Sequence, residues 1–208
     1  MLKLKSMKLL FSFIFIFGLS TSFSQTIVGS EIGVDGYLGA SNLGGSFGAG
    51  LKYGFKSPEN LIFGPSVRLM RTWSNYLGIK TSYNIWGGGV FAHYRYQNSL
   101  FAGAEFEMLK SPISYTAINP STNWAATLFI GAGFSREFNQ KIRLNIGLFY
   151  DVINADNSPF RPSYFMKIKD SQTGQVTKIL PFIYRLAVFI PLGNKEILEE
   201  EMEDDDSW

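Results

Sequence analysis

The stretch SFGAGLKYGF, from Ser46 to Phe55, alternates strictly between two kinds of residue. Its odd positions are apolar and its even positions are small or charged: Phe47, Ala49, Leu51, Tyr53 and Phe55 against Ser46, Gly48, Gly50, Lys52 and Gly54. Because successive side chains of a strand point to opposite faces, one face of this strand is wholly apolar. An apolar outside and a polar inside are typical of a transmembrane β-barrel, whereas a small soluble barrel has the reverse arrangement.

The same alternation recurs along the chain in eight segments, each about as long as a membrane strand. They are residues 27–38, 46–55, 61–72, 83–96, 99–109, 124–137, 141–152 and 180–192. In lipid the backbone polar groups of strands must all be paired, which requires a closed barrel. The sequence therefore predicts an all-β fold over residues 25–193, an eight-stranded antiparallel transmembrane up-and-down β-barrel. Pro65 lies inside the third segment and lacks an N–H donor, which weakens the strand prediction at this position or marks a bulge.

The connections between the segments alternate between long and short. In order they are residues 39–45, 57–60, 74–82, 97–98, 110–123, 138–140 and 153–179. Outer-membrane barrels have long external loops and tight periplasmic turns, so both termini are expected in the periplasm. Within the last connection, residues 164–170 and 175–179 flank the turn signal Ser171-Gln172-Thr173-Gly174, which predicts an extracellular hairpin that prolongs the last two strands. The rival interpretation makes residues 164–170 a membrane strand, but that segment is short and crowded with charge.

Both ends of the chain differ from the predicted barrel. Residues 1–24 combine three lysines, an apolar run from Leu9 to Leu19 and a small-x-small site at Ser22-Phe23-Ser24, which predicts a secretory signal peptide. Residues 194–208 contain eight acidic side chains, whereas residues 25–195 carry 16 Lys+Arg against 9 Asp+Glu. We expect an acidic periplasmic tail that is either solvated or docks on a basic periplasmic or outer-membrane protein.

Charged side chains are expected inside the barrel, because their parity places them on the polar face. The predicted lumen charge network consists of Glu31, Asp35, Lys52, Arg68, His93, Arg95, Glu105, Glu107, Arg143, Asp151 and Arg185. With Lys141 and Glu137, the inward set balances at six cations and six carboxylates. Isolated charges in a lumen just wide enough for side chains would be unfavourable, so mutual pairing is expected. A proton or ion path along the pairs is the functional alternative.

Little in the sequence points to catalysis or to a cofactor. The chain has no cysteine and one histidine, His93, so neither a disulfide nor a metal-ligand cluster is expected. The three glycines from Gly87 to Gly89 interrupt a strand and do not precede a helix, which argues against a phosphate loop. Nucleic-acid binding does not suit the compartment. We expect no cofactor and no enzymatic activity.

The chain resembles the small outer-membrane β-barrels of the OmpA/OmpX type, and especially the PorT-like barrel-domain proteins common in Bacteroidota. The resemblance lies in the leader ending SFSQT, in the strands SFGAGLKYGF and LFIGAGFS, and in the run FIYRLAVFIPLG. It implies an outer-membrane location; some members of the group act in type IX secretion. Some small barrels of this type are lipid A deacylases or acyltransferases with a His-x-Ser motif, whereas this chain has His93-Tyr94-Arg95.

The function favoured by the sequence is that of a structural or accessory component of the outer membrane with a filled lumen, in contact with lipid. Three alternatives stay open: an accessory subunit of a secretion or surface-assembly complex, a narrow channel, and a lipid A-modifying enzyme.

Overall fold

Eight antiparallel strands close into a barrel in which each strand pairs with two neighbours. A computed structural model describes residues 27–41, 44–76, 79–111, 124–138, 141–169, 172 and 176–192; the predicted leader and acidic tail lie outside these residues and stay predictions. The barrel strands are β1 (Gly29–Ser41), β2 (Gly44–Lys56), β3 (Leu61–Tyr76), β4 (Ile79–Tyr96), β5 (Leu100–Lys110), β6 (Trp124–Phe138), β7 (Ile142–Asp151) and β10 (Phe182–Leu192).

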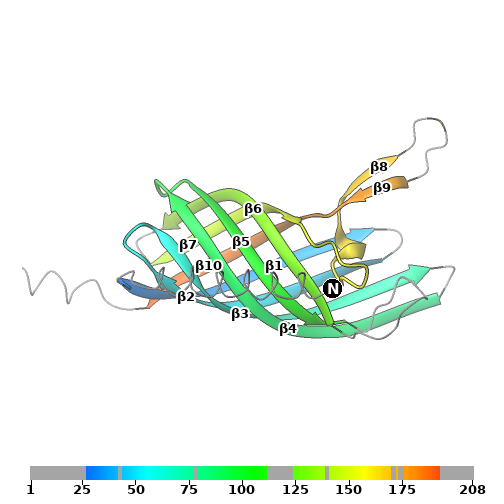
Figure 1. Ribbon diagram of the computed structural model, residues 1–208, viewed down its shortest axis with the longest axis horizontal. Helices are drawn as coiled ribbons and strands as arrows, with labels where there is room; N and C mark the ends of the chain where they lie inside the picture. Colours follow the sequence, from blue (N-terminus) through cyan, green and yellow to red (C-terminus); the bar gives the residue numbers. More distant parts are fainter. Residues whose placement is uncertain are drawn as a thin grey trace, which may run out of the picture.

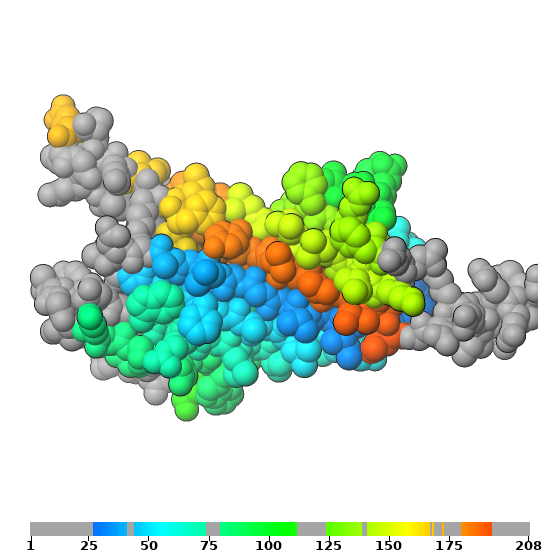
Figure 2. Space-filling model, turned by 180° about the vertical axis from the view of Figure 1, so that it is seen from behind, coloured from blue at the N-terminus to red at the C-terminus, as the bar shows by residue number. Residues whose placement is uncertain are grey.

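The order around the barrel is β1-β10-β7-β6-β5-β4-β3-β2, so every neighbour except the closing pair is also the next barrel strand in the sequence. The first and last strands close it, with Val34 opposite Val188. Figure 1 shows the strands crossing the barrel obliquely, and Figure 2 shows β10 in orange beside β1 in blue along the seam. The predicted eight-stranded up-and-down barrel is confirmed.

The side chains follow the predicted parity. Leu51, Val90, Ile130 and Leu186 lie on the outside with about half of their surface exposed. The interior instead holds the buried charged residues together with rings such as Phe91 and Phe129. An apolar exterior around a polar, filled interior is what lipid requires of a small barrel. No helix in the described residues is long and apolar enough to cross a membrane.

Two connections are shorter than the sequence predicted, because the strands around them are longer. The β1–β2 ladder runs to the pair Ser41 and Gly44, and the β3–β4 ladder runs to Tyr76 and Ile79. The expected loops 39–45 and 74–82 are therefore mostly strand. Their residues are largely polar or glycine, so backbone pairing continues where the apolar alternation that marks lipid contact has stopped.

Tight turns close the opposite end, which we call the short-turn end. Gln97 and Asn98 have φ of 47° and 51°, and Ser99 N–H donates to the Tyr96 carbonyl at 3.0 Å. Two central residues with positive φ match the twist of an antiparallel hairpin, and asparagine tolerates this conformation. The other end, which carries the β1–β2 and β3–β4 hairpins and residues 152–181, is the long-loop end.

Pro65 interrupts pairing on one side only and does not form a bulge. It pairs with Val90 of β4. On the β2 side the ladder passes from Lys52–Ser66 to Phe55–Phe63 without a change of register. The expected bulge is wrong here: proline has no N–H, so the ladder loses local pairing while the register holds.

The last connection folds in two parts. Residues 152–165, with the short 3-10 helix η1 (Arg161–Ser163), turn back over the long-loop end. The strands β8 (Met166–Lys169) and β9 (Val176–Leu180) then form a separate two-stranded hairpin that projects from that end (Figure 1). The expected hairpin is present, but it prolongs only β10. It does not prolong β7, because β7 ends at Asp151 and the chain folds inward there.

Candidate functional site

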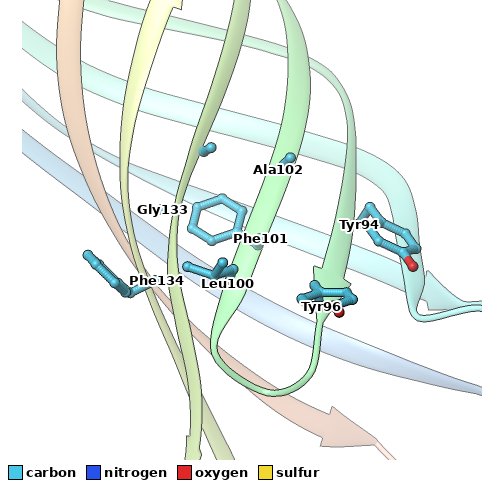
Figure 3. A pocket seen from close by; sticks show the side chains of 8 residues that line it. Tyr94, Tyr96, Leu100, Phe101, Ala102, Gly133 and Phe134 are labelled. Carbon is cyan, nitrogen blue, oxygen red and sulfur yellow. The ribbon is translucent and has the colours of Figure 1, made fainter.

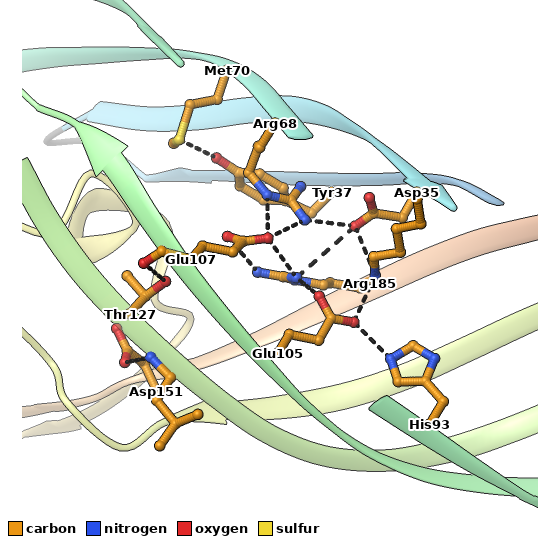
Figure 4. A network of polar contacts seen from close by, with 12 residues as sticks. Asp35, Tyr37, Arg68, Met70, His93, Glu105, Glu107, Thr127, Asp151 and Arg185 are labelled. Carbon is orange, nitrogen blue, oxygen red and sulfur yellow. Dashed lines mark hydrogen bonds and ion pairs between the residues drawn. The ribbon is translucent and has the colours of Figure 1, made fainter. Parts of the chain in front are cut away.

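Six charged side chains meet in the middle of the lumen, from strands on different sides of the barrel. They are three cations and three carboxylates: Lys52 of β2, Arg68 of β3 and Arg185 of β10, with Asp35 of β1 and Glu105 and Glu107 of β5. We call this set the central network. All six are at most 2% exposed, so water does not screen their charges. Figure 4 shows Arg185 between Glu105 and Glu107.

Each cation of the central network contacts at least two carboxylates. Arg68 Nη2 lies 2.8 Å from Asp35 Oδ2, and Arg68 also donates from Nε to Glu107 at 2.7 Å. Lys52 Nζ lies 2.6 Å from Glu105 and 3.7 Å from Asp35.

Arg185 contacts all three acids: it donates to Glu105, lies 3.3 Å from Glu107 and lies 4.0 Å from Asp35. Because β1 and β5 lie opposite each other in the strand order, these contacts tie the two walls together.

Charge balance and aromatic rings make this burial tolerable. Removing a charge from water is costly unless an opposite charge and hydrogen bonds replace the water, and here three cations face three carboxylates. The guanidinium of Arg185 also lies 4.3 Å from the Phe129 ring centroid and 5.5 Å from that of Phe160. Such contacts favour a desolvated cation.

Gly50 of β2 leaves space for two side chains of the central network. A Cβ on Gly50 would overlap Asp35 Oδ1 and would lie 3.2 Å from Arg68 Nη2. The backbone of β2 therefore passes directly behind the Asp35–Arg68 contact.

His93 joins the network through Glu105 alone. Its Nε2 lies 2.8 Å from Glu105 Oε1, and because a carboxylate accepts, Nε2 is the nitrogen that donates. The ring is surrounded by four phenylalanines, with centroids 5.2 to 6.3 Å away: Phe91, Phe101, Phe149 and Phe189. Nδ1 has no hydrogen-bond partner within the described residues. A general base needs one nitrogen in contact with a nucleophile, and neither nitrogen of His93 meets that requirement here.

Other predicted network members form separate contacts towards the short-turn end. Arg95 and Glu31 make a bidentate pair, with both hydrogen bonds at 2.8 Å, and the guanidinium lies 4.9 Å from the Phe189 ring centroid. Arg143 pairs with Glu137 at the mouth of the barrel and also donates to Asn98 Oδ1.

Lys141, which was expected inside, lies exposed in the turn before β7. That expectation is wrong because β7 begins at Ile142, so strand parity does not apply to Lys141.

Asp151 stands apart from the central network, at the long-loop end of β7. Its carboxylate accepts hydrogen bonds from the Tyr164 hydroxyl at 2.8 Å and from the backbone N–H groups of Leu128 and Asn154. No cation lies within ion-pair distance of Asp151 in the part of the chain that the structure describes. Burial and the neighbouring Asp151 carboxylate together raise the pKa of Tyr164, so its hydroxyl stays protonated and donates.

Residues 152–165 close the long-loop end, a feature that strand periodicity did not reveal. We call them the plug segment. Phe160 is fully buried, with ring centroids 5.0 Å from Tyr37 and 4.9 Å from Phe129. The Ser163 hydroxyl contacts that of Ser46, and Thr72 donates to the Pro159 carbonyl at 3.2 Å. The Pro-Phe-Arg-Pro-Ser run from Pro159 to Ser163 indicates only an irregular segment, so its burial could not be predicted.

The central network thus lies between two groups of buried apolar residues. The larger group includes Tyr37, Ile85, Leu109 and Phe160 towards the long-loop end and continues along the wall to Phe101. Towards the short-turn end lies a smaller one, formed by Ile62, Phe91, Ala187 and Phe189. Within the described residues, no group of three or more potential ligands among His, Cys, Asp and Glu is arranged to hold a metal ion.

Comparisons with known proteins found likeness only at the level of structure. No protein-family model matches the chain, and no curated protein matches it. Among solved structures, the outer membrane protein Ail of Yersinia pestis in a phospholipid bilayer nanodisc is 10% identical, with a TM-score of 0.43; the match covers 79% of this chain and 99% of that one. Neisserial surface protein A is 15% identical, with a TM-score of 0.44 and coverages of 80% and 99%. The N-terminal barrel domain of Pseudomonas aeruginosa OprF is 10% identical, with a TM-score of 0.39 and coverages of 78% and 97%.

The location of the protein follows from its own surface. The outward side chains in the middle of the strands, such as Leu51, Val90, Ile130 and Leu186, are apolar, and the six charged side chains of the central network are buried inside. Exposed charges such as Arg71, Lys110 and Arg136 lie towards the strand ends. Such a barrel is stable only with lipid around it, so the protein is an outer-membrane β-barrel.

Proposed function

We propose that this protein is a structural or accessory component of the outer membrane whose lumen does not conduct. The observation that carries the proposal is the central network, in which Arg185 links Glu105 and Glu107 of β5 to Asp35 of β1 across the lumen. An ion that entered would have to break several buried charge contacts and displace the plug segment. A barrel of eight strands leaves no further room, because its interior is filled by its own side chains.

A planar bilayer experiment tests this function. Pure refolded protein inserted into a bilayer should give no steady current, and Phe160→Ala should leave the membrane closed because the network below it still blocks the lumen. Reproducible ion-selective steps from the unmodified protein would overturn the proposal and favour the narrow channel.

The lipid A-modifying alternative has no support in the site. His93 contacts Glu105 through Nε2, its Nδ1 has no partner in the described part of the chain, and it is 1% exposed. A base that acts on a lipid ester must reach the membrane surface, whereas His93 faces the closed interior.

A second candidate, an accessory subunit of a secretion or surface-assembly complex, is favoured by the β8–β9 hairpin. This hairpin is a two-stranded sheet away from the barrel, and Phe165 and Met166 at its base are 48% and 41% exposed. The finer resemblance to PorT-like proteins and the acidic tail agree with this role. Affinity purification from native membranes, with the full chain and with chains lacking either residues 166–180 or residues 194–208, tests it. A protein lost with one deletion and retained with the other identifies the docking segment; identical recovery from all three chains argues against docking through either segment.

A further inference from the structure

A groove lies on the outside of the barrel, near the short-turn end of β4, β5 and β6. Its lining consists of Tyr94, Tyr96, Leu100, Phe101, Ala102, Ala132, Gly133 and Phe134. Figure 3 shows the rings of Tyr94 and Tyr96 on the β4 side and that of Phe134 on the β6 side, with Ala102 between them. The groove is therefore open to the lipid that surrounds the barrel.

The register explains why the surface is hollow here. One row across the three strands reads Tyr94, Ala102, Ala132, and the next row away from the short turns begins with the pair Ala92 and Ala104. The row towards the short turns is bulky, since Tyr96 lies opposite Leu100, and Leu100 lies opposite Phe134. Small side chains framed by large ones leave a depression that another apolar group can fill.

A cation stands at the short-turn edge of this groove. Arg136 follows Phe134 by two residues, so both side chains point outward, and Arg136 is exposed. No ion pair involves Arg136 in the described residues, whereas Arg143 on the adjacent strand is paired with Glu137. An outward arginine at the end of a membrane strand extends its guanidinium to the level of the lipid headgroups.

We propose that this groove is a binding site for one anionic phospholipid, with an acyl chain over Ala102 and Ala132 and the phosphate on Arg136. The location selects the ligand, because only a molecule within the bilayer reaches a lipid-facing groove. The apolar lining accepts a hydrocarbon chain, and the planar guanidinium suits a phosphate. The hydroxyl of Tyr96 supplies a further donor at the same edge.

The choice of phospholipid rests on the proposed orientation, in which the short-turn end faces the periplasm. The periplasmic leaflet of an outer membrane consists of phospholipids. The orientation is tested separately by epitope accessibility, so its failure is distinguishable from failure of the binding site.

Native mass spectrometry with phosphatidylglycerol tests the proposal. The intact refolded protein should retain one lipid after release from detergent. Ala102→Leu and Ala132→Leu, which fill the groove, and Arg136→Gln should each lower retention about tenfold, the change expected when one charge-assisted hydrogen bond or a few buried methylenes are lost. Arg136→Lys should restore part of the retention. Diacylglycerol, which has no phosphate, should bind more weakly and should not respond to Arg136→Gln.

Matched controls lie on β2, which is three positions from β5 and four positions from β6 in the ring of eight strands. Ala49→Leu enlarges an outward alanine there, and Lys56→Gln removes a cation at the same end of the barrel; neither should change retention. Equal retention by all variants would overturn the proposal. So would a dimer of the protein that disappears in Ala102→Leu, since the occupant of the groove would then be a second copy of this chain.

Discussion

Lys52 of β2 reaches Glu105 of β5 with Nζ 2.6 Å from Oε1, although β3 and β4 separate the two strands along the wall. Glu105 also accepts from Arg185 and contacts His93, so one carboxylate joins β2, β4, β5 and β10. A contact of this kind holds the barrel together through its interior, in addition to the backbone ladders around its circumference.

Glu105→Gln should destabilise the barrel more than an ordinary surface substitution. The change removes one of three carboxylates and leaves Lys52 and Arg185 buried with excess positive charge, which typically costs about 3–5 kcal/mol. The free energy of unfolding, measured by urea titration of the refolded protein in micelles, checks this. Glu59→Gln, at an exposed turn residue, is the control and should change little. Equal midpoints for both variants would show that the network contributes nothing to stability.

The stability cost of an arginine substitution on the outer face should depend on how deep the residue lies in the membrane. Leu51→Arg places a cation in the middle of β2 and should cost about 2–4 kcal/mol, whereas Phe138→Arg at the end of β6 should cost about 0–1 kcal/mol. Both side chains are about half exposed, so burial in protein does not separate them. Unfolding titrations in lipid vesicles provide the measurement. A larger penalty at Phe138 than at Leu51 would contradict the assigned membrane depth.

Strand parity could be predicted from the sequence because it has a period of exactly two. Parity alone predicts which side chains enter the lumen, and in the structure Asp35, Lys52 and Arg68 are buried. It did not give their height along the barrel axis, which depends on how far each strand is shifted against its neighbours. For that reason the sequence could not separate Asp151, at the end of β7, from the residues that meet at Arg185.

The plug segment was unpredictable for a different reason. Its burial depends on Phe160 and Tyr164, which pack into a space defined by the closed barrel. No periodicity marks such residues, since they belong to neither a strand nor a long helix. The hairpin after them was predictable, because a clear turn signal separates its two strands.

Tyr164→Phe should change how stability depends on pH. The folded pKa of Tyr164 is raised, so its contribution is fully present below the ordinary tyrosine pKa of about 10 and is lost as the pH rises towards the folded value. Above pH about 10 the unmodified protein should therefore lose stability more steeply than Tyr164→Phe. At neutral pH the variant should be about 1–3 kcal/mol less stable, because Asp151 loses its hydroxyl donor. Unfolding titrations at pH 7 to 11 measure both effects; stability curves that coincide for the two proteins over this range would exclude the proposed link between Tyr164 and Asp151.

The orientation of the barrel is testable on intact cells. If the short-turn end faces the periplasm, the β8–β9 hairpin lies outside the cell. The end of β10 at Leu192 then lies on the periplasmic side of the outer membrane. Trypsin added to intact cells should cut, if anywhere, at lysines between Lys167 and Lys178. These lysines belong to the hairpin and not to the part of the barrel that contacts the membrane.

An epitope placed after Trp208 should stay protected until the outer membrane is opened. A matched epitope between Gln172 and Gly174 should be stained before that step and serves as the positive control. If the Trp208 epitope were stained on intact cells while the hairpin epitope stayed protected, the barrel would have the opposite orientation in the membrane. It would also move the groove beside Arg136 to the outer leaflet, where the phospholipid proposed for it is not the main lipid.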